Sequence, residues 1–573
     1  MFFFARLVCV VCLVCPSLHP HVFQILAFSG HTVPSLSSRP SKAQRRQGRE
    51  DGGSRKGRPP QRHRDGYRGK RRKRDGETAE ERDELPLTPP DPKGLDAAVR
   101  VQRGKARLFE EGCRTIYGNA VCKPEKPIDA NSLVTVYDHC GSRFVGFGVF
   151  NPDSMFRVRL LSSLPPDPSL SSRENLQRAV RSNLETACHL RKALGLPSED
   201  TSAFRLVNGE GDGLPGLCVD VLTNDLAVVS SSARWCEWYE EEIRKEVASA
   251  VGGLTGVEGD KVRLIWRRTE SRLNQDGWKE TEKADGVEAR NDLLMNEEER
   301  RRDGKVLCWE NGLQFTARPF KGQKTGVYCD QRENRKFLRS LSALKGDGEV
   351  LDVFSFHGGF AVNALVGGAK TVIAVDSSAD ACNAAVEDLQ SNREGRAKET
   401  GSNSVELMET GTEWLPSVSA ETSNGTSGEV VRVVRGDGET AMRECAEAVR
   451  SGRCGGFDVV VLDPPKLAPS VQHLKAAKRK YERLNGLAMQ CLRKEGGVLL
   501  THTCSAALAS CGDPSEFLDV LESAALSAER QDGMKRRLVT MRVAGAAPDH
   551  PVDLKAREGA YLFSVALHVS PRT

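Results

Sequence analysis

The chain has 573 residues, of which 28% are charged, 39% hydrophobic and 6% aromatic. This length suits about three domains, and the composition excludes a collagen, a small disulfide-framed protein and a protein with many membrane spans. Residues 42–74 hold 15 basic and three acidic side chains, a surplus of +12, so with a net charge of +5 the remainder is −7. A nucleic-acid site in the folded part must therefore be a local basic patch.

The first 95 residues predict a targeting leader followed by a disordered basic linker. Phe2–Cys15 is apolar except for Arg6, which is short for a membrane span but suits the core of a secretory signal. The basic, acid-poor stretch that follows resembles a transit sequence, and the two-part leader is typical of a plastid protein. We expect an organelle, with a plastid favoured over a mitochondrion. If the start is wrongly assigned, we expect a cytoplasmic protein instead.

The 17 cysteines show no metal or disulfide framework. Their number is odd, and the only Cys-x-x-Cys spacings join Cys9, Cys12 and Cys15 within the apolar run. A zinc site needs paired Cys or His ligands at a defined spacing, and the sequence has no such set. We expect free thiols and no metal site.

Two small domains are expected ahead of the largest one. Residues 96–164 have β-rich runs separated by turns, at 133–137, 144–150 and 156–161, and indicate a small β domain. Residues 165–304 indicate an α+β unit with helices near 173–194 and 235–250 and strands near 203–207, 217–221 and 226–230. The charged insert at 267–304 is expected to be a surface loop.

Residues 305–573 alternate strands with helices, which predicts a parallel, doubly wound α/β sheet. The expected strands are 349–354, 371–375, 430–434, 458–462 and 497–501. A last pair, at about 536–543 and 560–569, is expected to form an antiparallel hairpin at one edge. The polar insert at 393–428 is expected to be a surface loop.

Polar residues follow these strands at the carboxyl ends, where ligands bind in open α/β sheets. Gly358 and Gly359 permit a tight turn and a close approach to a ligand. Asp376 ends the second strand, where an acid commonly accepts hydrogen bonds from ribose hydroxyls, although a helix cap is the plain alternative. Asp437 suits an adenine amino group or an ordinary turn.

More specific signals follow the last two of these strands. In Asp463-Pro464-Pro465-Lys466 the two prolines prevent a regular helix start and fix a rigid loop with an acid beside the cleft. Cys504 lies at the end of the next strand, where its thiolate could attack an electron-poor ring carbon; an inert buried thiol is the alternative. The polar run Lys321–Arg335 is expected to fold over a cofactor.

Together these segments resemble the bacterial large-subunit ribosomal RNA cytosine-5 methyltransferases of the RlmI type, over about residues 100–573 apart from the two inserts. The matching motifs are Gly209–Gly216, Lys324–Arg332, Phe354–Phe360, Asp463–Lys466, Thr503–Ser505 and Asp549–Pro551. The resemblance implies a PUA-like RNA-binding β-barrel at 96–164, a central α+β domain at 165–304, and a class I (Rossmann-like) methyltransferase domain at 305–573 that uses S-adenosylmethionine.

The resemblance also implies roles for single residues. The cofactor-binding residues would be Gln331, Arg332, Phe354, Gly358, Gly359, Asp376, Asp437 and Asp463. Cys504 would be the catalytic nucleophile that adds to carbon 6 of cytosine, and Asp463 would neutralise charge that develops on the ring. The group that takes the proton from carbon 5 stays open.

Two other functions also stay open. An RNA guanine N-methyltransferase would use Asp-Pro-Pro on a nitrogen target and would need no thiolate. An RNA-binding assembly factor would keep the fold without activity. The expected partner is ribosomal RNA of the large subunit, with no membrane after leader removal, and a homodimer is allowed for.

Overall fold

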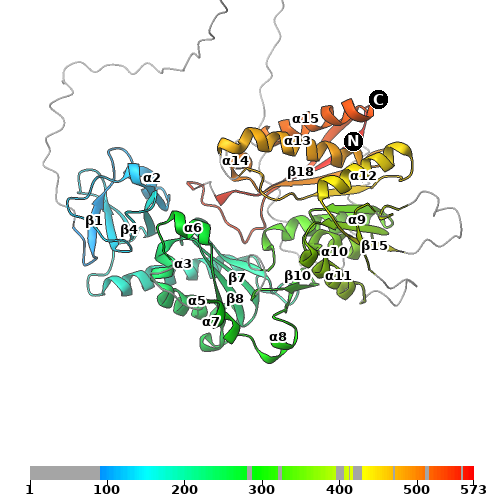
Figure 1. Cartoon of the computed structure of the whole chain (residues 1–573). Coiled ribbons are helices and arrows are strands. Elements are labelled where there is room, and N and C mark those ends of the chain that lie inside the picture. The colour runs from blue at the N-terminus through cyan, green and yellow to red at the C-terminus, as the bar shows by residue number, and fades with distance from the viewer. Residues whose placement is uncertain are drawn as a thin grey trace, which may run out of the picture. The chain divides into compact units, whose positions relative to one another are not determined.

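The structure, a computed structural model, describes residues 91–279, 287–320, 326–394, 405–411, 413–416, 429–468, 471–509, 515–556 and 559–572 (Figure 1). The leader and linker expected over residues 1–95 lie outside this range except for residues 91–95. Residues 321–325 of the polar run also lie outside it. Within the described residues, no helix combines the length and the apolar character needed to cross a bilayer.

The first sheet is built from residues 97–162 and has five strands in the order β1-β3-β4-β5-β2. Its elements are β1 (Ala97–Arg100), α2 (Ala106–Glu110), β2 (Thr115–Tyr117), η2 (Gly118–Ala120), β3 (Leu133–Tyr137), β4 (Phe144–Phe150) and β5 (Phe156–Ser162). Ile116, Val134 and Val158 are fully buried in its core. A side chain at Gly148 would place its Cβ 2.0 Å from the carbonyl oxygen of Arg159, so β4 and β5 pack closely only with glycine there.

The second sheet has four strands in the order β6-β7-β8-β9. Its elements are α3 (Ser172–Ala193), β6 (Phe204–Asn208), η3 (Gly209–Asp212), β7 (Leu217–Thr223), β8 (Leu226–Ser231), α4 (Arg234–Trp238), α5 (Glu240–Thr255), η4 (Gly259–Lys261) and β9 (Arg263–Arg268). Helix α3 begins with a capping box in which Ser171 and Glu174 satisfy each other's backbone N–H groups. Its apolar stripe, including Leu176, Val180 and Leu184, is buried.

The expectation of a plain surface loop at 267–304 is wrong for much of that insert. Strand β9 extends into it, and α6 (Glu270–Gln275), α7 (Val287–Leu293) and α8 (Glu297–Arg301) follow. Leu273 and Trp278 are 1% and 4% exposed, so two apolar residues five positions apart anchor the first part of this charged stretch. The amide of Asn291 bonds the backbone of Trp266 through both its nitrogen and its oxygen, which fixes α7 beside β9.

A short antiparallel hairpin, β10 (Val306–Glu310) and β11 (Leu313–Ala317), precedes the largest sheet. That sheet has eight strands in the order β14-β15-β13-β12-β16-β17-β19-β18. The strands are β12 (Glu349–Val353), β13 (Thr371–Asp376), β14 (Glu406–Glu409), β15 (Val430–Arg435), β16 (Val459–Leu462), β17 (Gly497–Thr503), β18 (Arg536–Ala544) and β19 (Phe563–Pro571). Its parallel part and its antiparallel β18–β19 edge confirm the predicted topology.

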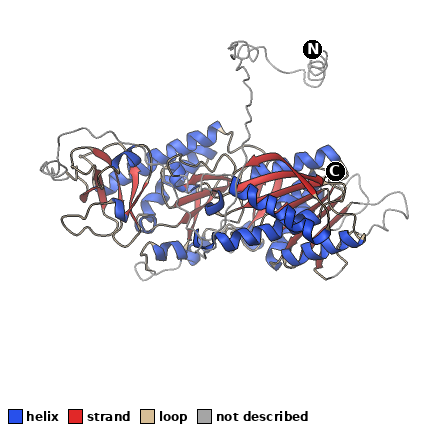
Figure 2. Ribbon diagram, turned by 90° about the horizontal axis from the view of Figure 1, so that it is seen from above, coloured by secondary structure: helices blue, strands red, loops and turns tan. Residues whose placement is uncertain are grey.

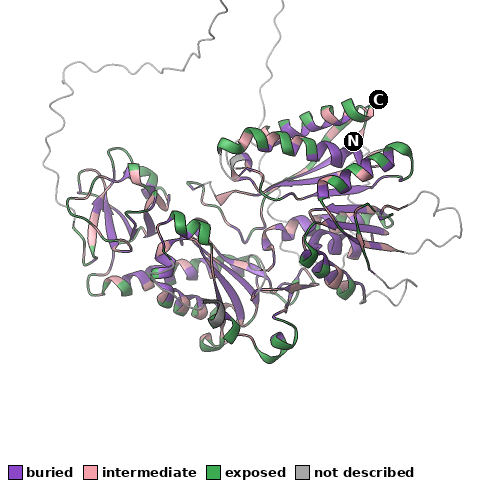
Figure 3. Ribbon diagram, in the orientation of Figure 1, coloured by how far each residue is buried: buried purple, intermediate pink, exposed green. Residues whose placement is uncertain are grey.

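Helices cover both faces of this sheet, as Figures 1 and 2 show. They are η6 (Cys329–Gln331), α9 (Arg332–Lys345), α10 (Gly359–Val366), α11 (Ala379–Glu394), α12 (Gly438–Ser451), η8 (Val471–His473), α13 (Leu474–Gln490), α14 (Ala506–Ala509) and α15 (Ser515–Asp532). Neighbouring residues on one strand belong to opposite cores: Leu351 packs with α12, α13 and α15, and Val350 packs with α9, α10 and α11. The central strands are therefore buried on both sides (Figure 3).

The polar insert at 393–428 was expected to be a loop, and this is wrong for its described part. Glu406–Glu409 form β14, which pairs in parallel with β15. Trp414 is 1% exposed, and its indole nitrogen donates a 2.7 Å hydrogen bond to Glu444. One buried tryptophan and one edge strand thus attach this segment, and a composition rich in Glu, Ser, Thr and Gly concealed both.

Candidate active site

The predicted site residues of the largest sheet lie along one edge, because its central strands are parallel. Val353 of β12 is paired with Val375 of β13 and with Leu462 of β16, and Leu462 is paired with Thr501 of β17. The residues that follow these strands therefore meet at one edge. Phe354, Asp463 and Cys504 directly follow β12, β16 and β17, Asp376 is the last residue of β13, and Asp437 lies two residues beyond β15.

The turn after β12 has an unusual backbone. Phe354, Phe356 and Gly358 all have positive φ, at 63°, 51° and 76°. This conformation is uncommon for a residue with a Cβ and tends to occur where function requires it. Helix α10 begins directly after Gly358, and a side chain at Gly359 would place its Cβ 2.9 Å from Cδ of Arg335. The turn is thus tightly wound at the start of a helix.

Two of the predicted acids, Asp376 and Asp437, also accept backbone hydrogen bonds that stabilise the loops at this edge. Asp376 accepts hydrogen bonds from the backbone N–H of Phe356 at 2.8 Å and of Ser378 at 2.9 Å, so it joins the ends of β12 and β13. Asp437 caps α12 by accepting from the N–H of Thr440 at 2.9 Å. A carboxylate oxygen can accept more than one hydrogen bond, so both acids keep capacity for a ligand.

Asp463 is connected to a chain of polar side chains. Its Oδ2 accepts from Nε2 of Gln331 at 2.9 Å. Oε1 of the Gln331 side chain accepts from Nδ2 of Asn334 at 2.7 Å, and Oδ1 of Asn334 accepts from Arg542 at 2.9 Å. Gln331 and Asn334 are 4% and 0% exposed, so the carboxylate of Asp463 is held by buried groups with one defined orientation.

Cys504 directly follows β17 and is half-buried. The hydroxyl of its neighbour Thr503 donates to the Tyr481 hydroxyl at 2.9 Å, and that hydroxyl lies 3.3 Å from Oγ of Ser505. Oγ of Ser505 also accepts from the N–H of Ala468, in the loop that Asp463 begins, at 3.2 Å. Tyr481 of α13 therefore holds both residues that flank Cys504. Burial raises the pKa of Tyr481, so its hydroxyl keeps its proton.

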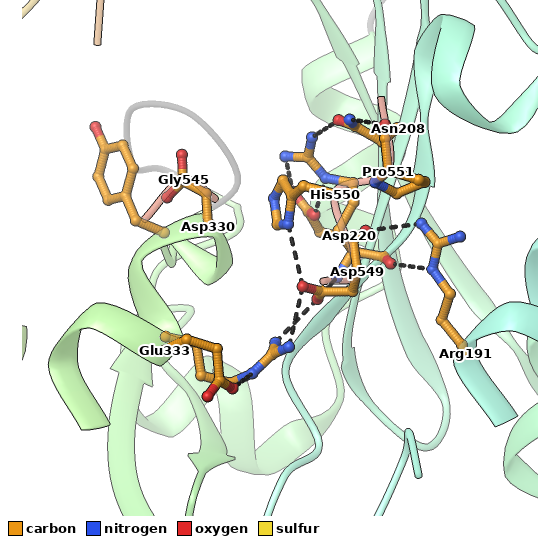
Figure 4. Close-up of polar contacts among 12 residues, drawn as sticks. Arg191, Asn208, Asp220, Asp330, Glu333, Gly545, Asp549, His550 and Pro551 are labelled. Atoms are coloured by element: carbon orange, nitrogen blue, oxygen red, sulfur yellow. Dashed lines mark hydrogen bonds and ion pairs between the residues drawn. The ribbon is translucent and has the colours of Figure 1, made fainter. Parts of the chain in front are cut away.

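Arg332 was predicted beside the cofactor, and the structure places its guanidinium on Asp549. The two groups form a fork with distances of 2.9 and 3.0 Å, and their side chains are 5% and 0% exposed. Asp549 also accepts from the N–H of Arg205 at 2.9 Å and lies 3.1 Å from the His550 ring (Figure 4). Burial alone would raise the pKa of Asp549, but its bond to His550 and the charge of Arg332 hold that pKa well below its usual range.

The segment Asp549–Pro551 joins the largest sheet to the central domain (Figure 4). Arg191, which is fully buried, donates to the carbonyl oxygen of Asp549 at 2.7 Å and forms a fork with Asp212 at 2.6 and 2.8 Å. The Asn208 amide donates to the carbonyl oxygen of Pro551 at 3.0 Å. A Cβ at Gly211 would lie 1.9 Å from that same oxygen. The glycine-rich motif Gly209–Gly216 is therefore the surface on which this segment docks.

Two buried titratable groups near the edge were not predicted as site residues. Asp352 of β12 is fully buried, and burial raises its pKa to about 8. His502 of β17 is also fully buried, its ring lies 5.1 Å from that of Phe360, and burial lowers its pKa to about 3. Burial therefore favours the uncharged form of both groups. The sequence alone could not mark them, because a single acid or histidine inside an apolar strand forms no motif.

The chain matches two known families of domains. Residues 99–163 match a PUA-like domain, and residues 303–405 match an S-adenosylmethionine-dependent methyltransferase domain.

All the cysteines that the structure describes have free thiols, as expected.

Curated relatives cover most of the chain. It is 29% identical over 479 residues to "Ribosomal RNA large subunit methyltransferase I" of Photobacterium profundum, which spans 83% of this chain and 98% of that protein. The protein of the same name from Escherichia coli O139:H28 is 28% identical over 455 residues, 79% of this chain and 94% of the relative. Among solved structures, SMU.776 complexed with SAH covers 82% of this chain and 100% of its own, with a TM-score of 0.57 at 17% identity. The last similarity supports the α/β fold.

Replacing Asp549 with Asn should destabilise the protein by about 3–5 kcal/mol at pH 7, because Arg332 would lose its charge partner while still buried. An acid whose pKa is lower in the folded state stabilises the fold above the unfolded pKa, near 4, and loses this contribution as the pH falls. The wild type should therefore weaken steadily below about pH 4, and Asp549→Asn should weaken less on the same acidification.

Urea unfolding followed by tryptophan fluorescence at pH 7 and at acid pH measures both effects. Asp519→Asn, at an exposed position of α15, is the matched control and should resemble the wild type. An unfolding free energy of Asp549→Asn equal to that of the control at pH 7 would show that the fork does not support the fold.

Proposed function

Since this chain belongs to the RlmI-like family, with a PUA-like domain and an S-adenosylmethionine-dependent methyltransferase domain, we propose that it methylates carbon 5 of a cytosine in ribosomal RNA of the large subunit. The observation that carries this proposal is the pair Asp463 and Cys504. They follow the adjacent parallel strands β16 and β17, and Tyr481 and Ser505 tie their two segments together. The names of the curated relatives support ribosomal RNA as the substrate.

The carboxyl edge of the sheet suits S-adenosylmethionine. The left-handed turn at Gly358 brings bare backbone to the edge, and Gly438 lacks a side chain where a Cβ would lie 2.9 Å from the Phe354 ring. We assign the ribose to Asp376 and the adenine to Asp437, with Phe354, Gly358, Gly359, Gln331 and Asp463 completing the site. When bound, the cofactor supplies a methyl group on a positively charged sulfur. Arg332 acts through its neighbour Gln331, because its own guanidinium is held by Asp549.

Carbon 5 of cytosine is a weak nucleophile, and Cys504 overcomes this. Its thiolate forms a bond to carbon 6, and the electron pair of the 5,6 double bond moves so that carbon 5 becomes nucleophilic. After carbon 5 has gained the methyl group, a base removes its proton. The carbon 6–sulfur bond then breaks, which restores the ring and the thiolate.

Asp463 provides the polar contact for the ring in this scheme. Bonded at nitrogen 3, its carboxyl group would offset the charge that develops there as sulfur adds to carbon 6. Gln331 holds one of its oxygens by a 2.9 Å bond, so this contact is preorganised. The target base must leave its stack to reach an edge of this kind, which favours an unpaired or flipped-out cytosine.

Replacing Cys504 with Ala should reduce methyl incorporation into unmodified large-subunit rRNA by at least about 10³-fold, because the nucleophile is lost. The wild type should form a covalent adduct with RNA containing 5-fluorocytosine, seen as a slower band on a denaturing gel, and Cys504→Ser should form none. Cys140→Ala, at an exposed position in the first sheet domain, is the control. Full activity of Cys504→Ala would favour a nitrogen target, and an adduct in Cys504→Ser would mean that another group is the nucleophile.

Asp463→Ala should abolish transfer of a tritiated methyl group to rRNA, while thermal unfolding stays close to that of the wild type. Asp463 is partly exposed in a loop, so its removal leaves no cavity in either core. Normal transfer by this variant would remove Asp463 from the mechanism.

Tyr481→Phe should lower kcat by about tenfold or more and leave the KM for RNA near that of the wild type, because it removes the hydroxyl that holds Thr503 and Ser505. The rate of adduct formation with 5-fluorocytosine RNA should fall in parallel. Tyr137→Phe is the matched control, since this buried hydroxyl meets no hydrogen-bond partner among the described residues. Unchanged kcat and adduct rates in Tyr481→Phe would show that Cys504 needs no such support.

A further inference from the structure

An RNA substrate needs positive charge close to the reacting base, and the chain outside residues 42–74 carries a net charge of −7. Helix α13 departs from this acidic average. Among its residues, Lys475, Lys478, Arg479, Lys480 and Arg483 are basic, and Glu482 alone is acidic. The helix is therefore a local concentration of positive charge of the kind that a nucleic acid requires.

The first two turns of α13 lie at the reactive edge of the sheet. The loop that begins with Asp463 leads from the carboxyl end of β16 into this helix, so the helix starts on that side. Tyr481 shows which part of the helix lies at the level of Cys504, since its hydroxyl contacts both neighbours of that residue. Lys475 precedes Tyr481 by six residues, which is about 9 Å along the helix axis at about 1.5 Å per residue.

Three of the basic side chains point to solvent. Ala477, Tyr481 and Leu484 form the buried side of α13, and Lys475, Arg479 and Lys480 are exposed. Lys475 and Arg479 are four residues apart and share one face. We call Lys475, Arg479 and Lys480 the α13 cationic stripe.

The α13 cationic stripe differs from its neighbours in its pairing. Lys478 forms an ion pair with Glu516 at 2.9 Å, and Arg483 forms one with Glu439 at 2.9 Å. Within the residues that the structure describes, the three stripe residues have no acidic partner. Surface cations that serve only solubility are commonly interspersed with acids. Three cations without an acidic partner among the described residues, on the helix whose Tyr481 contacts both neighbours of Cys504, fit a polyanion.

We propose that the α13 cationic stripe binds phosphates of the RNA strand that carries the target base. This inference rests on the proposed function and adds to it a second RNA contact, on the catalytic domain itself. Phosphate contacts orient a nucleic acid without reading its sequence, so the stripe holds the strand across the edge while a base enters between Asp463 and Cys504. Lys466, three residues after Asp463 in the loop that leads toward α13, is a further exposed cation.

The test compares two triple variants that lose the same charge. Lys475→Gln, Arg479→Gln and Lys480→Gln together remove the stripe. Lys494→Gln, Lys535→Gln and Arg537→Gln together form the control, because these exposed residues lie just before β17 and at the start of β18, at the opposite edge of the sheet. All six positions are exposed, so both proteins should fold like the wild type.

Binding of a labelled single-stranded rRNA fragment is measured by fluorescence anisotropy at several salt concentrations, and methyl transfer is measured separately. The stripe variant should bind at least about tenfold more weakly at moderate salt, and its log–log salt slope should be smaller by about 2, because about 0.7 counterions are released per phosphate contact on a single strand. Its kcat at saturating RNA and its affinity for S-adenosylmethionine should match the wild type.

The two arms separate the two proposals. Equal RNA affinity and salt slope in the stripe and control variants would overturn the proposal that the stripe binds RNA phosphates, whether or not the wild type methylates rRNA. Loss of RNA affinity in the stripe variant alone supports the stripe even if the wild type transfers no methyl group, a result that would count against the proposed function only.

Discussion

A buried carboxylate that stays ionised needs a positive charge close to it, and the Asp549–Arg332 fork provides this match where the largest sheet meets the central domain. Removing either partner would strand a charge in the interior. Asp549 belongs to the connection between β18 and β19, and Arg332 is the first residue of α9. The fork therefore joins the last hairpin of the largest sheet to the helix that precedes its first strand in the chain, β12. Arg205 and Arg191 of the central domain also donate hydrogen bonds to Asp549, so this residue contacts both domains.

The Asp549–Arg332 fork affects the edge of the sheet that holds Asp463 and Cys504, because Arg332 is adjacent to Gln331. Gln331 immediately precedes Arg332 and holds the carboxylate of Asp463. A buried ion pair is weak support for stability but can define a unique arrangement, and this one defines where the backbone of residues 331 and 332 lies. The orientation of Asp463 thus depends on contacts made far away along the chain. Tyr481 plays a comparable part for Cys504, since α13 fixes the thiol segment and also presents the cationic stripe.

The sequence predicted the main elements well because their signals are local. Leu133–Tyr137 and Phe144–Phe150 are strands with the predicted bounds, and the antiparallel hairpin expected at one edge of the sheet is formed by β18 and β19. Short motifs also located Asp376, Asp437, Asp463 and Cys504 at one edge, since parallel strands of alternating β and α elements must end on the same side. The two inserts were predicted less well, because a few buried residues, among them Trp278 and Trp414, attach long segments that are otherwise polar.

What the sequence by itself determined is the order of strands and helices and the residue types at the strand ends, since both follow from periodicity and from turn chemistry a few residues long. What only the tertiary structure decided is which side chains meet across the chain. Arg332 faces Asp549 rather than the edge, Tyr481 supports Cys504, and Gly209–Gly216 receives Asp549–Pro551. These contacts join residues up to hundreds of positions apart, and their identity depends on packing geometry, which no local pattern encodes.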